Sequence, residues 1–184
     1  MDFRDITEFF KDFMGLIIAF VVIVIIFTFV VAFHPVAGNS MTPTLAEGDI
    51  VLVSKFSQKI FDLKRNEIVI VKSKNEKTYI KRVIGLPGEK VDYLNGVLYI
   101  NDKGYKEPFL GEDVVTNNFL FEDICSKEDC PDGVIPEDMY LVLGDNRLDS
   151  YDSRDTELGL VPLSNVKGTV LMRIWPVNKI GFVD

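Results

Sequence analysis

The amino-acid sequence predicts a mostly β protein, a folded antiparallel sheet or barrel-like domain that follows one N-terminal transmembrane helix. Residues 13–33 form an uncharged run in which only Thr28 is clearly polar. Short β-branched segments, bounded by glycine, proline, asparagine or charged turns, recur through the rest of the chain. Asn95 and Gly96 lie between two such segments and suit the central positions of a type I′ hairpin turn. The 184 residues therefore accommodate one β domain and one apolar helix.

The apolar run of residues 13–33 is long enough for a membrane-spanning helix. Its 21 residues would extend roughly 31 Å at about 1.5 Å per residue, which matches the hydrocarbon core of a bilayer. Its β-branched residues favour a strand in water, but a chain in lipid must satisfy its own backbone and so forms a helix. The alternative is a cleaved secretory signal. Such a signal has a shorter apolar core, and residues 35–37 place a proline where a small residue is needed.

The charges around this run predict its orientation. Arg4 and Lys11 precede it, and no lysine or arginine follows until Lys55. Under the positive-inside rule, residues 1–12 are cytoplasmic and residues 34–184 are extracytoplasmic. The sequence therefore predicts a single-pass type II protein of the plasma membrane, with the lipid bilayer as a partner.

The remaining chain divides into predicted strands and loops. The predicted strands are residues 49–54, 67–71, 79–84, a hairpin over 93–100, 139–143 and 169–175. Residues 150–157 are polar and are predicted as a loop or a short helix. Residues 110–136 are acidic, lack periodicity and are predicted as a surface insertion. Within them, Cys125 and Cys130 either pair as a local disulfide of modest stabilising effect or remain free thiols.

Composition and missing motifs exclude several classes of function. The net charge of -8 and the absence of a basic stripe argue against nucleic-acid binding. The single histidine, His34, adjoins the apolar run, so we interpret it as an interfacial residue rather than a catalytic one. No Cys/His cluster has zinc-ligand spacing, and no glycine-rich nucleotide loop is present, so neither a metal nor a cofactor is expected.

A serine in residues 38–45 (GNSMTPTL) is the first candidate for chemistry. Gly38 permits close approach of a backbone or substrate, and Pro43 stiffens the chain that follows. Ser40 can therefore present its Oγ and its own N–H toward one point, where the N–H could stabilise an oxyanion. An ordinary solvated loop serine is the alternative interpretation.

A lysine in the predicted strand 79–84 is the second candidate. Alternation places Tyr79, Lys81 and Val83 on one face, and the residues between them on the other. A free lysine titrates near pH 10.4 and cannot act as a base at neutral pH. Apolar burial would lower the pKa of Lys81 and produce a neutral amine able to take the serine proton. A solvated strand lysine is the alternative.

Residues 144–154 (GDNRLDSYDSR) are dense in hydroxyl groups and opposite charges. Ser150 could hydrogen-bond the lysine amine and orient it. Asp145, Asp152 and Arg154 could form an ion-pair network that shapes the loop. The alternative is a hydrophilic turn whose surface ion pairs contribute about 0–1 kcal/mol each.

Four blocks in this order resemble the bacterial type I signal peptidases. They are residues 40–45 (SMTPTL), Gly48-Asp49, residues 79–89 (YIKRVIGLPGE) and residues 144–154. The apolar run before the first block matches as well, and only residues 110–136 lack a counterpart. The size and the single anchor resemble Gram-positive forms.

The resemblance implies a fold, a reaction and a role for each candidate residue. It implies a folded β-sheet on the membrane that cleaves signal peptides from secretory preproteins, with association with the export machinery and without a metal or cofactor. Ser40 would be the nucleophile and Lys81 the general base, with Ser150 orienting the lysine. Asp145, Asp152 and Arg154 would support the site. The residues implied to bind small side chains at the first and third positions before the cut are Val36, Ala37, Gly38, Met41, Tyr79 and Ile80.

One position departs from the pattern of part of the family. Some members carry a hydroxyl residue two positions before the nucleophile, where this chain has Gly38. Its oxyanion hole must then use backbone N–H groups or another donor.

Three alternative functions stay open. They are a dedicated peptidase for a narrow substrate set such as pilin-type subunits, a self-cleaving Ser/Lys repressor-type protease, and a catalytically inactive membrane-tethered binding module.

Overall fold

The computed structural model describes residues 3–25, 30–56, 62–111 and 113–183, and these confirm the mostly β prediction. The helices are α1 (Phe3–Ile25) and α3 (Phe121–Ile124). The strands are β1 (Val31–Pro35), β2 (Ile50–Ser54), β3 (Ile68–Lys72), β4 (Thr78–Gly85), β5 (Val91–Leu94), β6 (Val97–Ile100), β7 (Lys103–Tyr105), β8 (Met139–Leu143), β9 (Val161–Pro162), β10 (Val166–Trp175) and β11 (Gly181–Phe182).

The larger of two antiparallel sheets carries the site. Its strand order is β1-β2-β10-β3-β4-β8-β9, and β11 pairs with β10. Strand β10 is the longest because it pairs with β2 and with β3, with register shifts along both pairings. Strand β4 lies between β3 and β8, which buries its backbone on both sides. The predicted strands 49–54, 67–71, 79–84, 139–143 and 169–175 all fall on this sheet.

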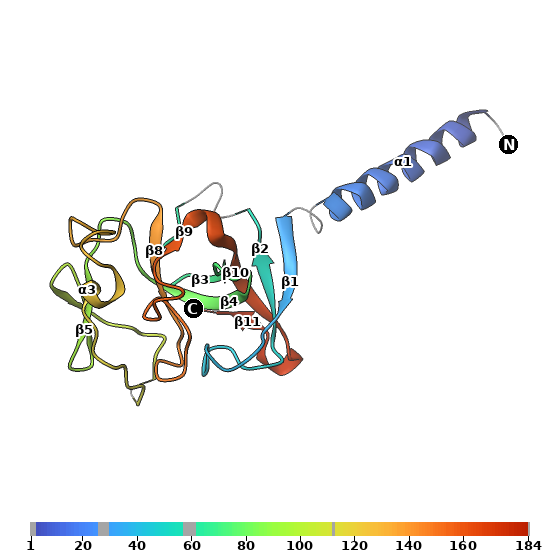
Figure 1. Cartoon of the computed structure of the whole chain (residues 1–184). Coiled ribbons are helices and arrows are strands. Elements are labelled where there is room, and N and C mark those ends of the chain that lie inside the picture. The colour runs from blue at the N-terminus through green and yellow to red at the C-terminus, as the bar shows by residue number, and fades with distance from the viewer. Residues whose placement is uncertain (1–2, 26–29, 57–61, 112, 184) are drawn as a thin grey trace.

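The smaller sheet, β5-β6-β7, lies at the end of the domain opposite α1 (Figure 1). Its first two strands form the predicted hairpin, joined by Asn95 and Gly96. Both turn residues have positive φ, 52° and 81° respectively, as a type I′ turn requires.

Three clusters of buried apolar side chains hold the fold together. One packs the smaller sheet against β4 and β8. A second packs the loop after β1 against β2, β3 and β10, and contains Met41 and Leu45. The third lies on another part of the sheet and includes Val83 and Val142. The loop after β1 and strand β4 are therefore both anchored in apolar cores, which fixes their relative position.

The prediction of one helix over residues 13–33 is wrong at its C-terminal end. Helix α1 is described from Phe3 to Ile25, and Val31, Ala32 and Phe33 belong to β1. These residues pair with β2, so the sheet satisfies backbone groups that a helix would otherwise satisfy, and strand-prone residues favour that solution. Residues 26–29, in the C-terminal half of the predicted helix, lie outside the described residues. Within the described part of the chain, no helix combines the length and hydropathy needed to cross a membrane.

Residues 110–136 differ from the predicted surface insertion. Phe119, Phe121, Cys130 and Ile135 are buried in the cluster beneath the smaller sheet. The backbone of Phe119 also exchanges hydrogen bonds with Tyr93 of β5. The apolar surface of the hairpin needs a cover, and this segment supplies it although its overall composition is acidic. Of the two alternatives for residues 150–157, a loop or a short helix, the structure shows the loop, as a series of bends and turns.

Candidate active site

Ser40 lies in the loop that connects β1 to β2. The backbone N–H of Val36 donates to the carbonyl of Asp49 at 2.8 Å and closes the base of the loop. Met41 and Leu45 are buried, 1% and 0% exposed, and fasten the loop to the core. Ser40 itself remains half-buried. The local sequence thus presents one hydroxyl from a rigid loop.

Gly38 adopts a backbone conformation that favours glycine. Its φ is 78°, in the left-handed region that L side chains rarely adopt. A Cβ there would meet no atom within 4 Å, so the constraint comes from the backbone conformation and not from crowding. The shape of this loop therefore accounts for glycine at the position where some signal peptidases carry a hydroxyl residue.

Lys81 lies on β4, opposite Val69 of β3, and its side chain reaches the serine. The Nζ of Lys81 donates a hydrogen bond to the Oγ of Ser40 at 2.7 Å. Burial is the largest influence on this amine and lowers the pKa of Lys81 from 10.5 to about 8. The structure therefore joins the two predicted residues in one contact. A neutral amine at the same place can accept the proton of the hydroxyl.

Asp152 and Arg154 set the charge near Lys81. Burial raises the pKa of Asp152, but the bonds and charge of Arg154 outweigh it, so the pKa of Asp152 is below its ordinary value. Arg154 donates from Nε to Oδ1 at 2.8 Å and from Nη2 to Oδ2 at 2.7 Å. Asp152 thus stays anionic with its own counterion. The negative charge of Asp152 raises the pKa of Lys81, and the positive charge of Arg154 lowers it. Burial is the largest influence, so the pKa of Lys81 remains below its ordinary value.

Asp145 belongs to a separate ion pair, which corrects the prediction of one network with Asp152 and Arg154. Its partner is Arg82, which donates from Nε to Oδ1 at 2.9 Å and from Nη2 to Oδ2 at 2.7 Å. Both side chains are 0% exposed. Thr44 also donates to Asp145, at 2.5 Å. Thr44 lies in the loop that carries Ser40, and Arg82 follows Lys81 in β4. Asp145 bonds both of them and therefore links the serine loop to the strand that carries Lys81.

Ser150 is half-buried, with its Oγ shielded from solvent, but it does not make the predicted hydrogen bond to Lys81. Its Oγ has no hydrogen-bond partner among the described residues, and the lysine amine contacts Ser40 instead. Gly144 brings the two serines together, because a Cβ at Gly144 would collide with Ser150 Oγ and with the carbonyl oxygen of Ser40. The loop of residues 144–154 therefore packs directly against the nucleophile loop.

A small groove of about 60 Å³ opens beside Ser40. The predicted binding residues that line it are Val36, Ala37, Gly38, Met41, Tyr79 and Ile80. Three residues that were not predicted to bind substrate, His34, Pro35 and Thr78, also line the groove. Their adjacency in the chain to Val36 and Tyr79 was the available signal. The groove is small and partly apolar, so it suits small side chains.

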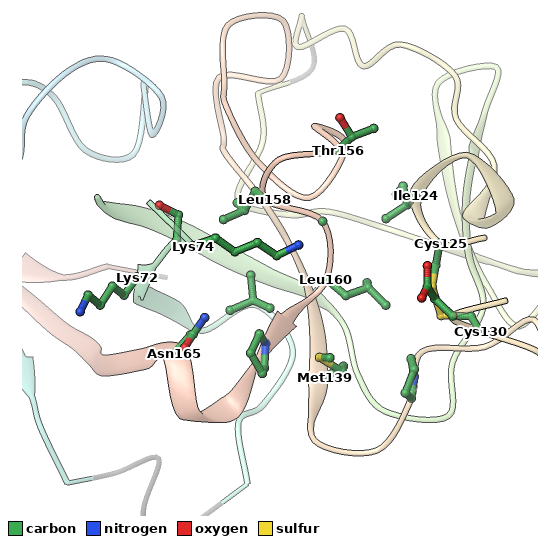
Figure 2. Close-up of a pocket in the computed structure, with 16 residues that line it drawn as sticks. Lys72, Lys74, Ile124, Cys125, Cys130, Met139, Thr156, Leu158, Leu160 and Asn165 are labelled. Carbon is green, nitrogen blue, oxygen red and sulfur yellow. A yellow bond between two sulfur atoms is a disulfide. The ribbon is translucent and has the colours of Figure 1, made fainter. Parts of the chain in front are cut away.

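A larger cavity of about 360 Å³ lies away from this groove (Figure 2). The disulfide between Cys125 and Cys130 forms one side of it, and Lys72 and Lys74 lie on the other. The cysteines are therefore paired. None of the predicted site residues lines this cavity, so we place the chemistry at the smaller groove.

Sequence reasoning missed the partners of several charged groups. The alternation of the strand put Arg82 on the face opposite Lys81 but predicted no partner for it. A buried cation in an apolar strand requires an acidic partner. Thr44 and Arg147 received no role, and Glu107 lies outside every motif block. Arg147 is fully buried and bonds Glu107. These partners are distant in sequence, so no local pattern could identify them.

The sequence of the chain is similar to those of known signal peptidases. The family model described as signal peptidase, peptidase S26, matches residues 7–175. Signal peptidase I of Bacillus caldolyticus is 37% identical over 161 aligned residues, which cover 84% of this chain and 85% of the relative. Signal peptidase IB of Staphylococcus aureus is 36% identical over 173 aligned residues, which cover 90% of this chain and 89% of the relative.

A solved structure extends the likeness to the fold. The crystal structure of a signal peptidase I from Enterococcus faecalis is 34% identical, with a TM-score of 0.51. The match covers 60% of this chain and 97% of that structure. The antiparallel β domain is therefore the fold of a signal peptidase I. The chain belongs to the signal peptidase family, peptidase S26, and is a hydrolase of the serine peptidase class.

Proposed function

We propose that this chain removes N-terminal signal peptides from secreted preproteins, with Ser40 as nucleophile and Lys81 as general base. The observation that carries the proposal is the 2.7 Å contact between the Oγ of Ser40 and the buried Nζ of Lys81. The names of the relatives, signal peptidase I and IB, support the choice of substrate. Association with the export machinery follows from that substrate.

The reaction begins when neutral Lys81 accepts the hydroxyl proton of Ser40 as Oγ bonds to the scissile carbonyl carbon. The tetrahedral intermediate then collapses, and Lys81 gives the proton to the departing amine. This step leaves an ester between Ser40 and the signal peptide. Lys81, neutral again, takes a proton from water as the water oxygen bonds to the ester carbon. The bond from that carbon to Oγ then breaks, Lys81 returns the proton to Oγ of Ser40, and the signal peptide leaves as a carboxylic acid that ionises in water. Each step keeps the proton within reach of one amine, so no metal or cofactor is required.

The oxyanion of the tetrahedral intermediate needs hydrogen-bond donors. The backbone N–H of Ser40 is our first candidate, because Gly38 offers no hydroxyl. Asp145, through Arg82 and Thr44, would hold the serine loop on β4. Asp152 and Arg154 would control the charge near Lys81.

The groove would select the residues before the cut. The volume of the groove is about 60 Å³, and its lining includes Tyr79 and Ile80 together with Val36 and Ala37. That volume accepts small side chains and disfavours bulky ones at the first and third positions before the cut. A hydrophobic pocket of this kind discriminates by about 1–3 kcal/mol per additional methylene.

We further propose that the domain works at the outer face of the plasma membrane, with residues 1–12 in the cytoplasm. Many apolar side chains of α1 are exposed, among them Leu16 and Phe20. Trp175 and Phe182 are exposed on β10 and β11. Strand β10 pairs with β2, which pairs with β1, and β11 pairs with β10. Such surface is favourable in lipid and unfavourable in water. Protease protection in sealed vesicles, with tags at the two ends, tests this orientation.

The test of function is cleavage of a panel of preproteins by the full chain in detergent, with each cut mapped by mass spectrometry. We expect cuts after small residues for the wild type and none for Ser40→Ala or Lys81→Ala. Ser164→Ala, at an exposed serine outside the groove, is the matched control and should cut normally. Retained cleavage by either dyad variant would refute the assigned roles.

The same panel separates the alternatives. Cleavage of pilin-type subunits alone would indicate a dedicated peptidase. Absence of any cut, together with failure of a serine-directed probe to label Ser40, would indicate an inactive binding module.

A further inference from the structure

Arg147 carries a buried charge in the loop that packs against Ser40. Its side chain is 0% exposed. Both terminal nitrogens donate to Glu107, at 3.0 Å to Oε2 and 2.5 Å to Oε1, and Nη1 also donates to Thr116 Oγ1 at 3.2 Å. A bidentate carboxylate is the partner that makes a buried guanidinium tolerable. Arg147 therefore depends on the segment that follows β7.

The same segment contacts the second buried arginine of the site. Phe109, two residues after Glu107, has its ring centre 3.9 Å from the guanidinium carbon of Arg82. The ring lies 6.0 Å from the guanidinium carbon of Arg147. Glu107 and Phe109 thus contact the two buried arginines of the site, although neither Glu107 nor Phe109 belongs to the motif blocks.

A short series of hydrogen bonds leads from Arg147 to Ser40. Arg147 Nε donates to the carbonyl of Gly144 at 3.1 Å, and the carbonyl of Arg147 accepts from Arg154 Nη1 at 2.7 Å. Asn146 N donates to the carbonyl of Ser40 at 3.0 Å. The position of Arg147 therefore sets the position of the loop that contacts the serine and carries the charges nearest to Lys81.

We propose that Glu107 is a positioning residue for the peptidase reaction. By neutralising Arg147 it holds residues 144–154 against Ser40 and keeps Asp152 near Lys81. The smaller sheet and the segment after it are then a support for the active site as well as a separate layer of the fold. The activity part of this inference rests on the proposed function.

Loss of the Glu107 charge would leave Arg147 with an uncompensated positive charge, and its loop would shift away from Ser40. That shift would change the burial of Lys81 and its distances to Asp152 and Arg154, which are the three largest influences on its pKa. The titration midpoint of Lys81 should therefore differ from that of the wild type, which a mere loss of stability would not cause.

The experiment compares Glu107→Gln, Glu107→Asp and the wild type, each as the full chain in detergent. Glu128→Gln, the same change at an exposed position, is the matched control. Preprotein cleavage gives kcat and KM, and NMR of labelled lysine gives the midpoint of Lys81, assigned with Lys81→Met. We expect Glu107→Gln to lose about 10- to 100-fold in kcat with little change in KM. Its Lys81 midpoint should move by about half a pH unit or more.

Glu107→Asp keeps the charge and should retain most of the rate and the wild-type midpoint. Glu128→Gln should match the wild type in both measurements. If Glu107→Gln does not fold, Thr116→Val replaces it, because this change removes one hydrogen bond of Arg147 and leaves its charge pair. We expect that variant to lose about two- to fivefold in kcat.

A folded Glu107→Gln variant with kcat within twofold of the wild type would overturn the proposal. A rate loss without a shift of the Lys81 midpoint would also overturn it, since that is the result of a purely structural role. Where Thr116→Val stands in, an unchanged kcat has the same meaning. The NMR titration needs no substrate, so failure of the wild type to cut preproteins would remove the proposed function and leave the positioning role separately testable.

Discussion

Lys81 and Arg82 are adjacent in β4 and are both buried, yet the structure treats their charges in opposite ways. Arg82 pairs with both oxygens of Asp145, whereas the nearest group to Lys81 is the neutral hydroxyl of Ser40. A paired guanidinium keeps its charge, and an unpaired buried ammonium loses its proton more easily. One strand therefore supplies a fixed cation for structure and a titratable amine for chemistry.

This difference predicts the pH dependence of cleavage. Burial lowers the pKa of Lys81 to about 8, and the reaction needs the neutral amine. About one tenth of the molecules should carry it at pH 7 and about nine tenths at pH 9. We expect kcat/KM to rise with pH and to level off above pH 8, as measured with a peptide substrate that has no titrating group in this range. A rate that declines between pH 6 and pH 9 would contradict a lysine base.

The same burial predicts that Lys81 reduces stability at neutral pH. The folded-state pKa lies below the unfolded-state value, so the folded chain binds fewer protons. The penalty is fully present below pH 8, and it decreases as pH rises toward 10.5. We expect Lys81→Met to abolish activity and to stabilise the fold at pH 7 by about 1–3 kcal/mol, after loss of the bond to Ser40. Urea unfolding at pH 7 and pH 10 checks this, and a destabilised variant at pH 7 would oppose it.

The Arg82–Asp145 pair should be essential to the fold. Asp145→Asn removes the counterion of a guanidinium that water cannot reach, and breaking such a pair destabilises by about 3–5 kcal/mol. Glu76→Gln breaks the pair with Lys72 at a carboxylate that is 77% exposed, and this control should change stability by about 0–1 kcal/mol. Denaturant unfolding compares the two variants. Equal effects would mean that burial of the Arg82–Asp145 pair has no energetic importance.

Gly144 should not tolerate even one added methyl group. A Cβ there would overlap the Oγ of Ser150 and the carbonyl oxygen of Ser40, and the carbonyl cannot move without the nucleophile. We expect Gly144→Ala to reduce kcat/KM by about 100-fold and stability by about 1–3 kcal/mol. Gly111→Ala is the control, because its new methyl group would meet its nearest neighbour, Val114, at 4.0 Å. Activity assays and thermal unfolding of both variants decide the matter, and a fully active Gly144→Ala would show that the two loops can separate.

Much of the fold followed from local patterns. The predicted strands coincide with β2, β3, β4, β8 and β10 because their β-branched residues and flanking turns act over a few residues. Strand β1 was missed because its residues continue an apolar run, and only pairing with β2 makes them a strand. Strands β9 and β11 have two residues each, too few for a period to be visible.

The sequence by itself determined the β class, the chemical groups of the site and the resemblance of Ser40, Lys81 and residues 144–154 to one family, since each depends on residues close together in the chain. Only the tertiary structure decided which groups meet. Lys81 bonds Ser40, and Arg147 pairs with Glu107. Asp145 and Asp152 belong to different ion pairs. The Oγ of Ser150 has no hydrogen-bond partner among the described residues. Burial and long-range contact set the pKa of an amine and the partner of a buried charge, and neither is a property of a local sequence.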